Sequence, residues 1–155
     1  MTPCINFAKK SKIFYKVHEY THESSNTSYG IEAAEKMCVP EDQVFKTLVV
    51  SLGEKELAVG VLPVSAKLSM KLIAKALGAK KAAMAAASDV ERSTGYVLGG
   101  VSPLGQKKNL KTIIHADAKH YSTIFVSAGR RGLEIELKPN DLETLTRGKF
   151  AEICQ

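Results

Sequence analysis

The sequence predicts a mixed α/β fold in a single domain over residues 1–155, with a sheet that is mixed or largely antiparallel. A length of 155 residues suits one domain. Patterns typical of helices and of strands alternate along the chain, and short turns join several strand patterns as in hairpins. No internal repeat, linker or low-complexity segment interrupts these patterns.

In the first half of the chain, cap residues mark the helices and runs of apolar and β-branched residues mark the strands. Thr2 and Pro3 match an N-cap and a first helical residue, while Ser69 and Gly78 bracket a later helix. The expected elements are a helix to about residue 10, a strand over 14–20, a polar loop over 21–30, a helix over 31–37, strands over 43–52 and 56–64, and a helix over 70–77.

In the second half, Ser88 and Glu91 have the spacing of a capping box, which predicts a short helix that ends at Gly95. The glycine-rich stretch GYVLGGVSPLGQKKNLK, residues 95–111, is expected to be irregular. The remaining expected elements are a short strand near 80–85, strands near 112–115, 122–127 and 133–137, and a helix over 140–146 after Pro139.

The composition excludes several classes of protein. Hydrophobic residues make up 45% of the chain and charged residues 25%, as is usual for globular proteins. No apolar run approaches the roughly 20 residues of a membrane span, and the N-terminal residues lack the apolar core of a signal peptide. Three cysteines without CxxC spacing favour free thiols. We therefore expect a cytoplasmic protein with no metal, no other cofactor and no membrane partner.

The net charge of +6 is concentrated in short clusters. These clusters are Lys9, Lys10 and Lys12; Lys80 and Lys81; Lys107, Lys108 and Lys111; and Arg130 and Arg131. Such groups can neutralise phosphates and give salt-dependent binding to nucleic acid. A solvated lysine-rich surface is the alternative, and an aromatic content of 6% without Trp offers little for base stacking.

Lys46 is the most unusual residue of the expected strands, because the strand period places it on one face with three aliphatic residues, Val44, Leu48 and Val50. An unpaired buried ammonium costs several kcal/mol. Two interpretations stay open: Lys46 lies near a strand end and reaches water, or it opens into a cleft and serves an anionic or carbonyl-bearing ligand.

Other catalytic patterns are absent from the sequence. Gly100 and Gly105 flank Ser102 at a spacing that matches neither GxSxG nor a phosphate-binding loop. Ser127 precedes AGRRG, which suits either a tight hairpin or a ligand-binding turn. The four histidines form no metal-ligand set and no serine–histidine–acid set. An enzyme with this sequence would use neither a metal nor an obvious protein nucleophile.

Five segments occur in order along nearly the whole chain: MTP, FKTLVV, KALGAKK, STGYVLGGVSPLGQKK and FVSAGRRGLEIEL. Together they resemble the YbaK family of Cys-tRNA(Pro) deacylases, which is related to the editing domain of bacterial prolyl-tRNA synthetases. The resemblance implies a mixed α/β fold around a curved sheet with flanking short helices. It also implies hydrolysis of the ester that joins cysteine to mischarged tRNA(Pro).

The resemblance also implies roles for individual residues, with Lys46 as the catalytic residue. The residues implied in substrate binding are Tyr20, Tyr29, Thr47, Gly99, Gly100, Ser127 and Arg130. Those implied in tRNA binding are Lys107, Lys108, Lys111 and Arg131. Glu134 stands where relatives commonly have an aspartate, and its longer side chain leaves its role open.

In the mechanism that the family implies, the cysteine thiol of the substrate attacks its own ester, while Lys46 and the amides of the glycine loop stabilise the oxyanion. None of the three cysteines of the chain is expected near the cleft. The expected partners are mischarged tRNA(Pro) and, as a further candidate, prolyl-tRNA synthetase. The alternatives are a deacylase of Ala-tRNA(Pro) or another mischarged tRNA, a non-catalytic RNA-binding module, and an adaptor that docks on a synthetase.

Overall fold

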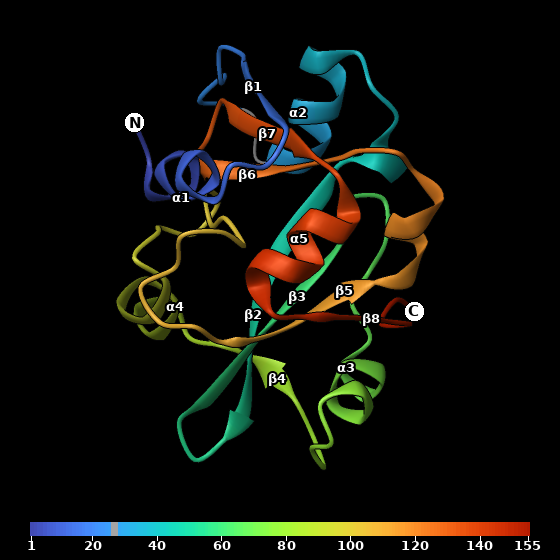
Figure 1. Ribbon diagram of the computed structural model, residues 1–155. Coiled ribbons are helices and arrows are strands. Elements are labelled where there is room, and N and C mark those ends of the chain that lie inside the picture. Colours follow the sequence, from blue (N-terminus) through green and yellow to red (C-terminus); the bar gives the residue numbers. More distant parts are fainter. Residues whose placement is uncertain (26–27) are drawn as a thin grey trace.

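The computed structural model describes residues 1–25 and 28–155 (Figure 1). The helical elements are α1 (Pro3–Ser11), α2 (Tyr29–Met37), η1 (Glu41–Gln43), α3 (Met70–Ala76), α4 (Ala87–Thr94), η2 (Ala116–His120) and α5 (Pro139–Thr146). The strands are β1 (Tyr15–Glu19), β2 (Phe45–Gly53), β3 (Glu56–Pro63), β4 (Ala83–Met84), β5 (Lys111–His115), β6 (Ile124–Arg130), β7 (Leu133–Leu137) and β8 (Lys149–Ala151). The predicted α/β class is confirmed. Part of the polar loop expected over 21–30, residues 26–27, lies outside the described residues.

The strands form two sheets. One is antiparallel with the order β1-β7-β6, and the other has the order β4-β2-β3-β5-β8. In the second sheet β2 pairs antiparallel with β3 and β4, while β5 runs parallel to both β3 and β8. The expected mixed and mostly antiparallel pairing is therefore found, but divided between two sheets. A parallel bridge between Val44 and Phe125 links them.

The predicted caps at Thr2, Ser69 and Gly95 are present. The Thr2 side chain accepts from the Ile5 amide at 3.3 Å, and the Ser69 hydroxyl accepts from the Leu72 amide at 3.1 Å. Gly95 ends α4 with φ of +83°, a conformation that glycine adopts without steric cost. Sequence-local capping chemistry thus sets these three boundaries.

Three helix starts differ from the prediction, and the smallest difference is at α5, which begins at Pro139 and not at residue 140. The capping box at Ser88 is wrong, because α4 begins at Ala87 with Ala86 as its N-cap and with no side-chain cap hydrogen bond. Helix α2 begins at Tyr29, two residues before the expected start. The sequence reading also missed η2 and β8; β8 is three residues long and is held by parallel pairing with β5, which no local pattern announces.

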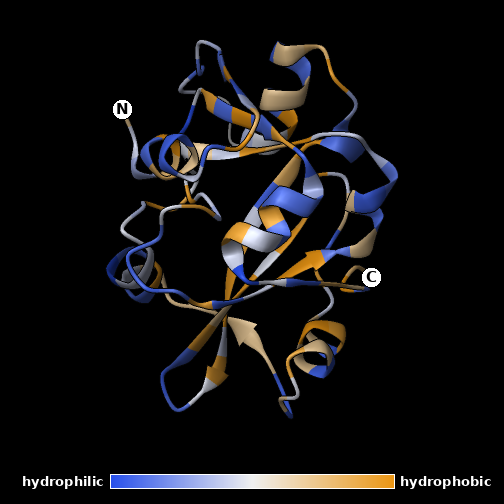
Figure 2. Cartoon of the chain, in the orientation of Figure 1, coloured by the Kyte–Doolittle hydropathy of each residue, from blue (hydrophilic) through white to orange (hydrophobic). Residues whose placement is uncertain are grey.

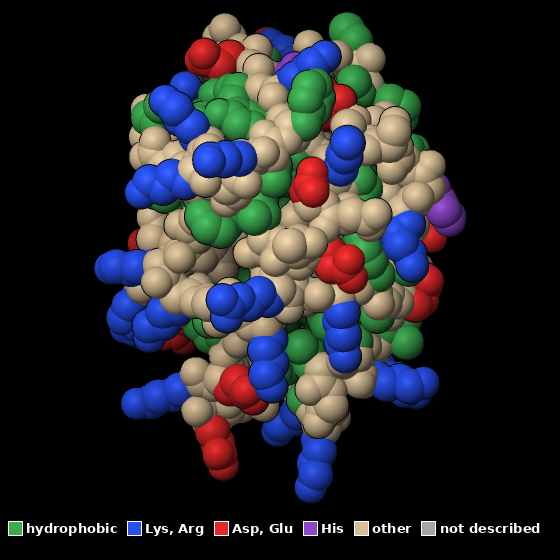
Figure 3. All heavy atoms as spheres, viewed as in Figure 1, with side chains coloured by type: hydrophobic (Ala, Val, Ile, Leu, Met, Phe, Trp, Pro, Cys, Tyr) green, Lys and Arg blue, Asp and Glu red, His purple; other side chains and the backbone are tan. Residues whose placement is uncertain are grey.

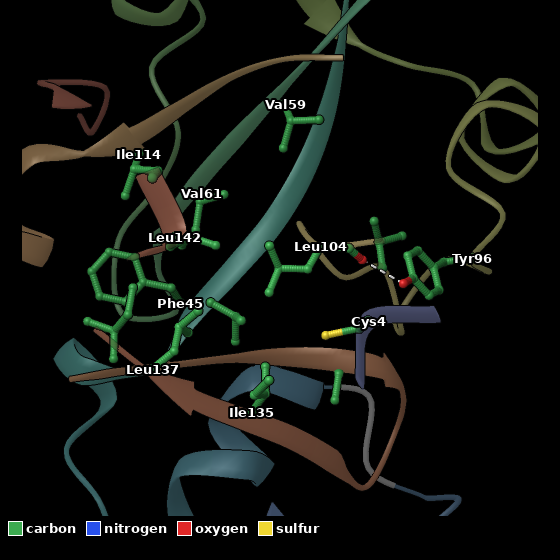
Figure 4. Packing of buried hydrophobic residues seen from close by; sticks show 14 of the residues in the cluster. Cys4, Phe45, Val59, Val61, Tyr96, Leu104, Ile114, Ile135, Leu137 and Leu142 are labelled. Atoms are coloured by element: carbon green, nitrogen blue, oxygen red, sulfur yellow. Dashed lines mark hydrogen bonds between the residues drawn. The ribbon is translucent and has the colours of Figure 1, made fainter. Parts of the chain in front are cut away.

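The main core lies between the two sheets. Phe45, Val59 and Val61 from the β2–β3 pair are buried against Ile135 and Leu137 of β7 (Figure 4). Figure 2 shows these central strands in hydrophobic colours, whereas α5 carries both colours as expected for a helix that covers the core with one side. Phe45 on this face of β2 is therefore part of the core.

The opposite face of β2 and β3 packs against α3. Val50 and Leu62 are buried there with Ile73 of α3 in a second cluster. Lys46 lies directly opposite Leu62 in the register, so its side chain projects from this face. The predicted strand period around Lys46 is confirmed.

Helix α2 closes the seam where the two sheets meet. Its Ala33 and Ala34 pack against Val44 and Phe125, the two residues of the bridge. The start of β2 and the β6–β7 hairpin therefore approach each other beside α2. This junction holds the largest concentration of the residues singled out from the sequence.

Candidate active site

A cavity of about 410 Å³ opens at this junction, between α2, the start of β2, the β6–β7 hairpin and the loop at residues 98–101. The sequence-predicted residues that line it are Tyr20, Tyr29, Lys46, Thr47, Gly99, Ser127, Arg130 and Arg131. Glu134 lines it as well. The fold thus brings together in one pocket residues that are up to 114 positions apart, from Tyr20 to Glu134.

Lys46 is half-buried in the wall of this pocket. Its Nζ donates a hydrogen bond to the carbonyl oxygen of Ala66 at 2.7 Å. Burial lowers the pKa of Lys46, and the nearby Lys67 ammonium lowers it further. An ammonium has three N–H donors, so two remain for a ligand. Of the two open interpretations, the structure therefore supports the one in which Lys46 opens into a cleft.

Tyr29 and Arg131 form one wall of the pocket as a stacked pair. The Arg131 guanidinium lies 3.8 Å from the centre of the Tyr29 ring, which is cation–π geometry. Gly99 packs against both with φ of +90°, and a Cβ at this position would lie 2.8 Å from Arg131 and 2.9 Å from Tyr29. Glycine is therefore required at this point of the wall.

The Tyr29 ring also contacts His22, which forms an ion pair with the buried Glu32. Glu32 is only 1% exposed, and its carboxylate accepts from the Glu23 amide at 2.9 Å and pairs with His22 Nδ1 at 2.6 Å. Burial alone would raise the pKa of Glu32, but these partners hold it below its ordinary value. His22 in turn lies edge-on to the Tyr29 ring. The sequence reading missed this support, because His22 and Glu32 fit no motif.

Glu134 and Ser127 face the pocket from neighbouring strands, where they are direct register partners. Glu134 is 7% exposed, and no hydrogen bond or ion pair joins it to any other residue of the described ranges 1–25 and 28–155. Burial raises the pKa of Glu134 to about 8. The Ser127 hydroxyl accepts from the Gly129 amide at 3.1 Å. The glutamate is therefore the less satisfied of the pair.

Two residues of the predicted set behave differently from their neighbours. Gly100 does not line the pocket; its amide donates to the Val97 carbonyl at 3.0 Å and its backbone packs on Arg130. Its amide is therefore already bonded within the turn, and its predicted contact with the substrate stays a prediction. The buried Thr47 hydroxyl lines the pocket without a hydrogen-bond partner in the described part of the chain.

The three lysines predicted to bind tRNA lie away from the pocket. Lys111 begins β5 opposite Ala58, whereas Lys46 lies opposite Leu62, four residues or roughly 13 Å further along β3. Lys111 also lies 3.8 Å from Glu56. Figure 3 shows Lys and Arg side chains spread widely over this view of the surface. Of the four predicted tRNA contacts, only Arg131 is at the pocket.

All three cysteines are free thiols, as predicted, and none of them is among the described residues that line the pocket. Cys154 interacts electrostatically with Lys46, and Cys4 on α1 interacts in the same way with Glu134. Burial raises the pKa of each of these thiols to about 11. Both thiols are therefore neutral at physiological pH, which makes them poor nucleophiles.

Cys154 belongs to a C-terminal segment that supports the Lys46 anchor. It bridges to Leu68, and the amide of residue 155 donates to the Lys67 carbonyl at 2.9 Å. The Ser69 amide donates to the Ile153 carbonyl at 2.8 Å. The segment that carries Ala66 is thus paired with residues 153–155.

Among the described residues, His115, Asp117 and Glu152 form a group with the spacing of metal ligands. The Ile153 amide donates to His115 Nδ1 at 3.2 Å, so the proton of the neutral ring lies on Nε2. Nε2 is 3.3 Å from Asp117 and donates toward it. A protonated ring nitrogen has no lone pair for a metal, so the group serves to attach the C-terminal segment. Likewise within the described ranges, no helix is long and apolar enough to cross a membrane.

Comparison with protein families assigns the chain to a known family. A family model described as "Aminoacyl-tRNA editing domain" matches residues 22–145. The chain belongs to this family. The resemblance found in the sequence is thereby confirmed, and the matched range includes every residue of the pocket except Tyr20.

Two relatives of this editing domain are similar over most of their length. A protein of Enterococcus faecalis named "Putative Cys-tRNA(Pro)/Cys-tRNA(Cys) deacylase EbsC" is 39% identical over 152 residues, which cover 98% of this chain and 92% of the relative. The protein YwhH of Bacillus subtilis is 27% identical over 139 residues, which cover 89% of this chain and 88% of the relative.

Solved structures show the same fold at lower identity. The structure titled "Crystal structure of a putative trans-editing enzyme for prolyl tRNA synthetase" aligns with a TM-score of 0.85 at 23% identity, over 100% of this chain and 99% of that one. The hypothetical protein APE2540 aligns with a TM-score of 0.85 at 22% identity, over 99% of this chain and 100% of that one. These matches establish the fold of the editing domain.

Proposed function

We propose that this editing domain deacylates Cys-tRNA(Pro), with the cysteine thiol of the substrate as the nucleophile. The observation that carries the proposal is the makeup of the pocket: a tethered ammonium with two free donors, and neither histidine nor cysteine among the described lining residues. The relative EbsC, by its name a deacylase of Cys-tRNA(Pro) and Cys-tRNA(Cys), supports the same substrate class.

The proposed reaction needs no protein nucleophile. The thiolate of the cysteinyl group attacks the ester carbonyl, so that an S–C bond forms and the C–O bond to the ribose breaks. The thiol proton ends on the ribose oxygen, and the products are the free tRNA and a cyclic thioester that water then opens. The four-membered ring forms within one bound residue, so the attack is intramolecular.

We propose two groups of the pocket as donors to the oxyanion of this step. Lys46 offers two N–H donors, and the Gly99 amide has no hydrogen-bond acceptor among the described residues. Preorganised donors of this kind are worth about 10²–10³ in turnover each. Gly100, whose amide is already bonded, takes no part.

The chemistry of the substrate explains selectivity that the pocket volume cannot supply. A pocket separates side chains that differ by one methylene by only about 1–3 kcal/mol, and cysteine, serine and alanine are close in size. A thiol with a pKa of about 8.5 is partly ionised at neutral pH. Serine and alanine lack this nucleophile. Their esters can therefore enter a cavity of about 410 Å³ and still remain uncleaved.

Deacylation assays with Cys-, Ala- and Ser-tRNA(Pro) and with Cys-tRNA(Cys) test the proposed substrate. We expect rapid release of cysteine and slow release of alanine and serine. Faster cleavage of Ala-tRNA(Pro) would move the assignment to that substrate, and binding without turnover of any substrate would leave an RNA-binding module or an adaptor. Adding prolyl-tRNA synthetase shows whether that partner delivers tRNA(Pro), since a synthetase that does so will raise the rate for tRNA(Pro) alone.

The origin of the nucleophile needs a separate experiment. A variant with Cys4, Cys38 and Cys154 all replaced by alanine is expected to deacylate Cys-tRNA(Pro) still. Methylating the thiol of the substrate is expected to nearly abolish turnover while leaving binding measurable. Rapid hydrolysis of the S-methylated substrate would contradict the mechanism and indicate an activated water or Ser127 as the nucleophile.

A further inference from the structure

The proposed reaction gives no role to two pocket groups without hydrogen-bond partners in the described ranges, the Thr47 hydroxyl and the Glu134 carboxyl, and of these Glu134 is the ionisable one. Its carboxyl lines the cavity, is 7% exposed, and has no partner in residues 1–25 and 28–155. Glu136, two positions away on the same strand, is more exposed yet pairs with both His18 and Thr123. Burying a carboxyl without a partner is costly, so its position indicates a partner that arrives with the ligand.

The chemistry of an aminoacyl ester identifies that partner. The ester carries a carbonyl, a side chain and an α-amino group, and an α-amino group is largely cationic at neutral pH. The other charged groups that line the pocket are Lys46, Arg130 and Arg131, all cations that repel an ammonium. Among the described lining residues, Glu134 is the only acid. Charge complementarity therefore selects the α-ammonium as the group that it receives.

The position of Glu134 suits this contact. Glu134 belongs to β7 and lies beside Ser127 of the neighbouring strand β6, whereas Lys46 reaches the pocket from β2. Donors for the carbonyl and an acceptor for the amine thus come from the two different sheets. An ester bound between them would have its carbonyl and its amino group fixed at once, which orients the remaining side chain.

We propose that Glu134 binds the α-ammonium group of the aminoacyl ester and so makes a free amino group a requirement for substrates. This inference rests on the deacylase function proposed above, since it names how the same pocket holds the aminoacyl group.

The proton count of this contact balances. Burial raises the pKa of Glu134 to about 8, so the carboxyl is mostly protonated in the empty pocket at neutral pH. When the ester binds, that proton passes to a neutral amine or, for an amine already protonated, to the solvent. The titratable and charged groups around Glu134 are Cys4 from α1, His18 and Tyr20 from β1 and its end, Lys46 from β2, and Arg130 and Arg131 from the β6–β7 hairpin.

A cycle of one substitution and one substrate change tests the proposal. Cys-tRNA(Pro) and N-acetyl-Cys-tRNA(Pro) are compared as substrates for the wild-type protein and for Glu134→Gln, which keeps the side-chain shape. Losing one partner of a buried charge pair has a large cost, so we expect N-acetylation to lower kcat/KM at least about 30-fold for the wild type. For Glu134→Gln the further loss on N-acetylation should be under about 3-fold, because the partner is already gone.

Two controls keep the result interpretable. Glu91→Gln removes an acid of the same kind from the exposed surface of α4, outside the pocket, and should respond to N-acetylation as the wild type does. If Glu134→Gln proves inactive, the affinities for the S-methylated and the N-acetylated, S-methylated substrates replace kcat/KM in the same cycle.

The outcomes separate this inference from the proposed function. If N-acetylation lowers kcat/KM equally for the wild type and for Glu134→Gln, the contact is overturned while the deacylase function stands. The same conclusion follows if N-acetylation does not lower kcat/KM of the wild type. If the wild type cleaves neither substrate, the function itself fails. The contact is supported if N-acetylation lowers kcat/KM only for the wild type and does so mainly by raising KM.

Discussion

Two glutamates on one face of β7 have opposite environments. We call Glu136 with His18 and Thr123 the paired end of this face, and Glu134 with Ser127 the open end. At the paired end His18 lies 2.9 Å and Thr123 2.6 Å from the carboxylate, whereas at the open end the carboxyl faces a cavity. Burial alone would raise the pKa of Glu136, but its partners hold it below the ordinary value, and burial raises that of Glu134 to about 8.

The different environments of the two glutamates assign one of them to the stability of the fold and the other to ligand binding, although both belong to β7. The other face of the same strand, with Ile135 and Leu137, is buried in the core and fixes the register of both glutamates. The paired end then adds stability to the fold, while the open end keeps an unsatisfied group available. Unsatisfied buried groups are expected at functional sites, since a ligand can satisfy them.

The largest effect is expected when a donor is removed from the pocket. Lys46→Ala should lower turnover of Cys-tRNA(Pro) about 10²–10³-fold, as for the loss of an oxyanion donor. Thermal unfolding should remain close to that of the wild type, because the substitution also removes a half-buried charge. Lys149→Ala, at an exposed strand position outside the pocket, is the matched control and should retain activity. Near-normal turnover by folded Lys46→Ala would take this residue out of the mechanism.

The pH dependence of stability should distinguish the open end. The folded pKa of Glu134, about 8, lies above the ordinary value of 4.5. Its contribution to stability is therefore fully present below pH 4.5 and is lost as the pH rises through 8. Each unit of pKa shift is worth about 1.36 kcal/mol, so the wild type should lose a few kcal/mol across this range relative to Glu134→Gln. Urea titrations at several pH values measure this difference, and parallel profiles would contradict it.

The paired end should show the opposite behaviour on substitution. Glu136→Ala removes the acceptor of two hydrogen bonds and is expected to lower the free energy of unfolding by about 1–3 kcal/mol at pH 7. Its turnover should stay near that of the wild type, since Glu136 does not line the pocket. A stability loss for Glu134→Gln as large as that for Glu136→Ala would remove the distinction between the two ends.

The smallest effect concerns lysines far from both ends. Replacing Lys107, Lys108 and Lys111 by alanine tests their predicted contact with tRNA phosphates. The slope of log K against log salt should fall by about 0.7–0.9 for each lysine that touches a phosphate. The matched control replaces Lys16, Lys71 and Lys75, which are exposed and belong to none of the basic clusters. Equal slopes in both triple variants would leave Arg131, at the pocket, as the better candidate for the tRNA contact.

Local chemistry made much of the fold predictable. The caps at Thr2 and Ser69 depend on hydrogen bonds that span three residues, and the strand period around Lys46 depends on alternate side chains. The capping box at Ser88 failed because the helix begins two residues earlier than that cap requires, after Ala86, where no side chain caps the helix. Strand β8 could not be found, because its pairing with β5 involves residues more than thirty positions apart.

The site was predictable from the residues alone only where a residue type is costly to bury in its expected surroundings. A lysine among aliphatic residues draws attention to Lys46, and the family resemblance supplied most other residues of the pocket. The missing partner of Glu134 is a property of the folded environment, since its neighbour Glu136 looks identical in the sequence LEIEL. The position of Lys111, four register places from Lys46 along β3, likewise depends on how the strands pair.

The pairing of residues 153–155 with the segment that holds Ala66 has a practical consequence for handling the protein. The amide of residue 155 donates to the carbonyl of Lys67, which follows Ala66, the residue whose carbonyl accepts the hydrogen bond from Lys46. A group attached at residue 155 therefore lies two hydrogen bonds from the Lys46 ammonium. Met1, by contrast, is 82% exposed and precedes α1. Affinity tags, surface immobilisation and fluorescent fusions are therefore better attached before Met1, because residue 155 is hydrogen-bonded to the segment that holds Lys46.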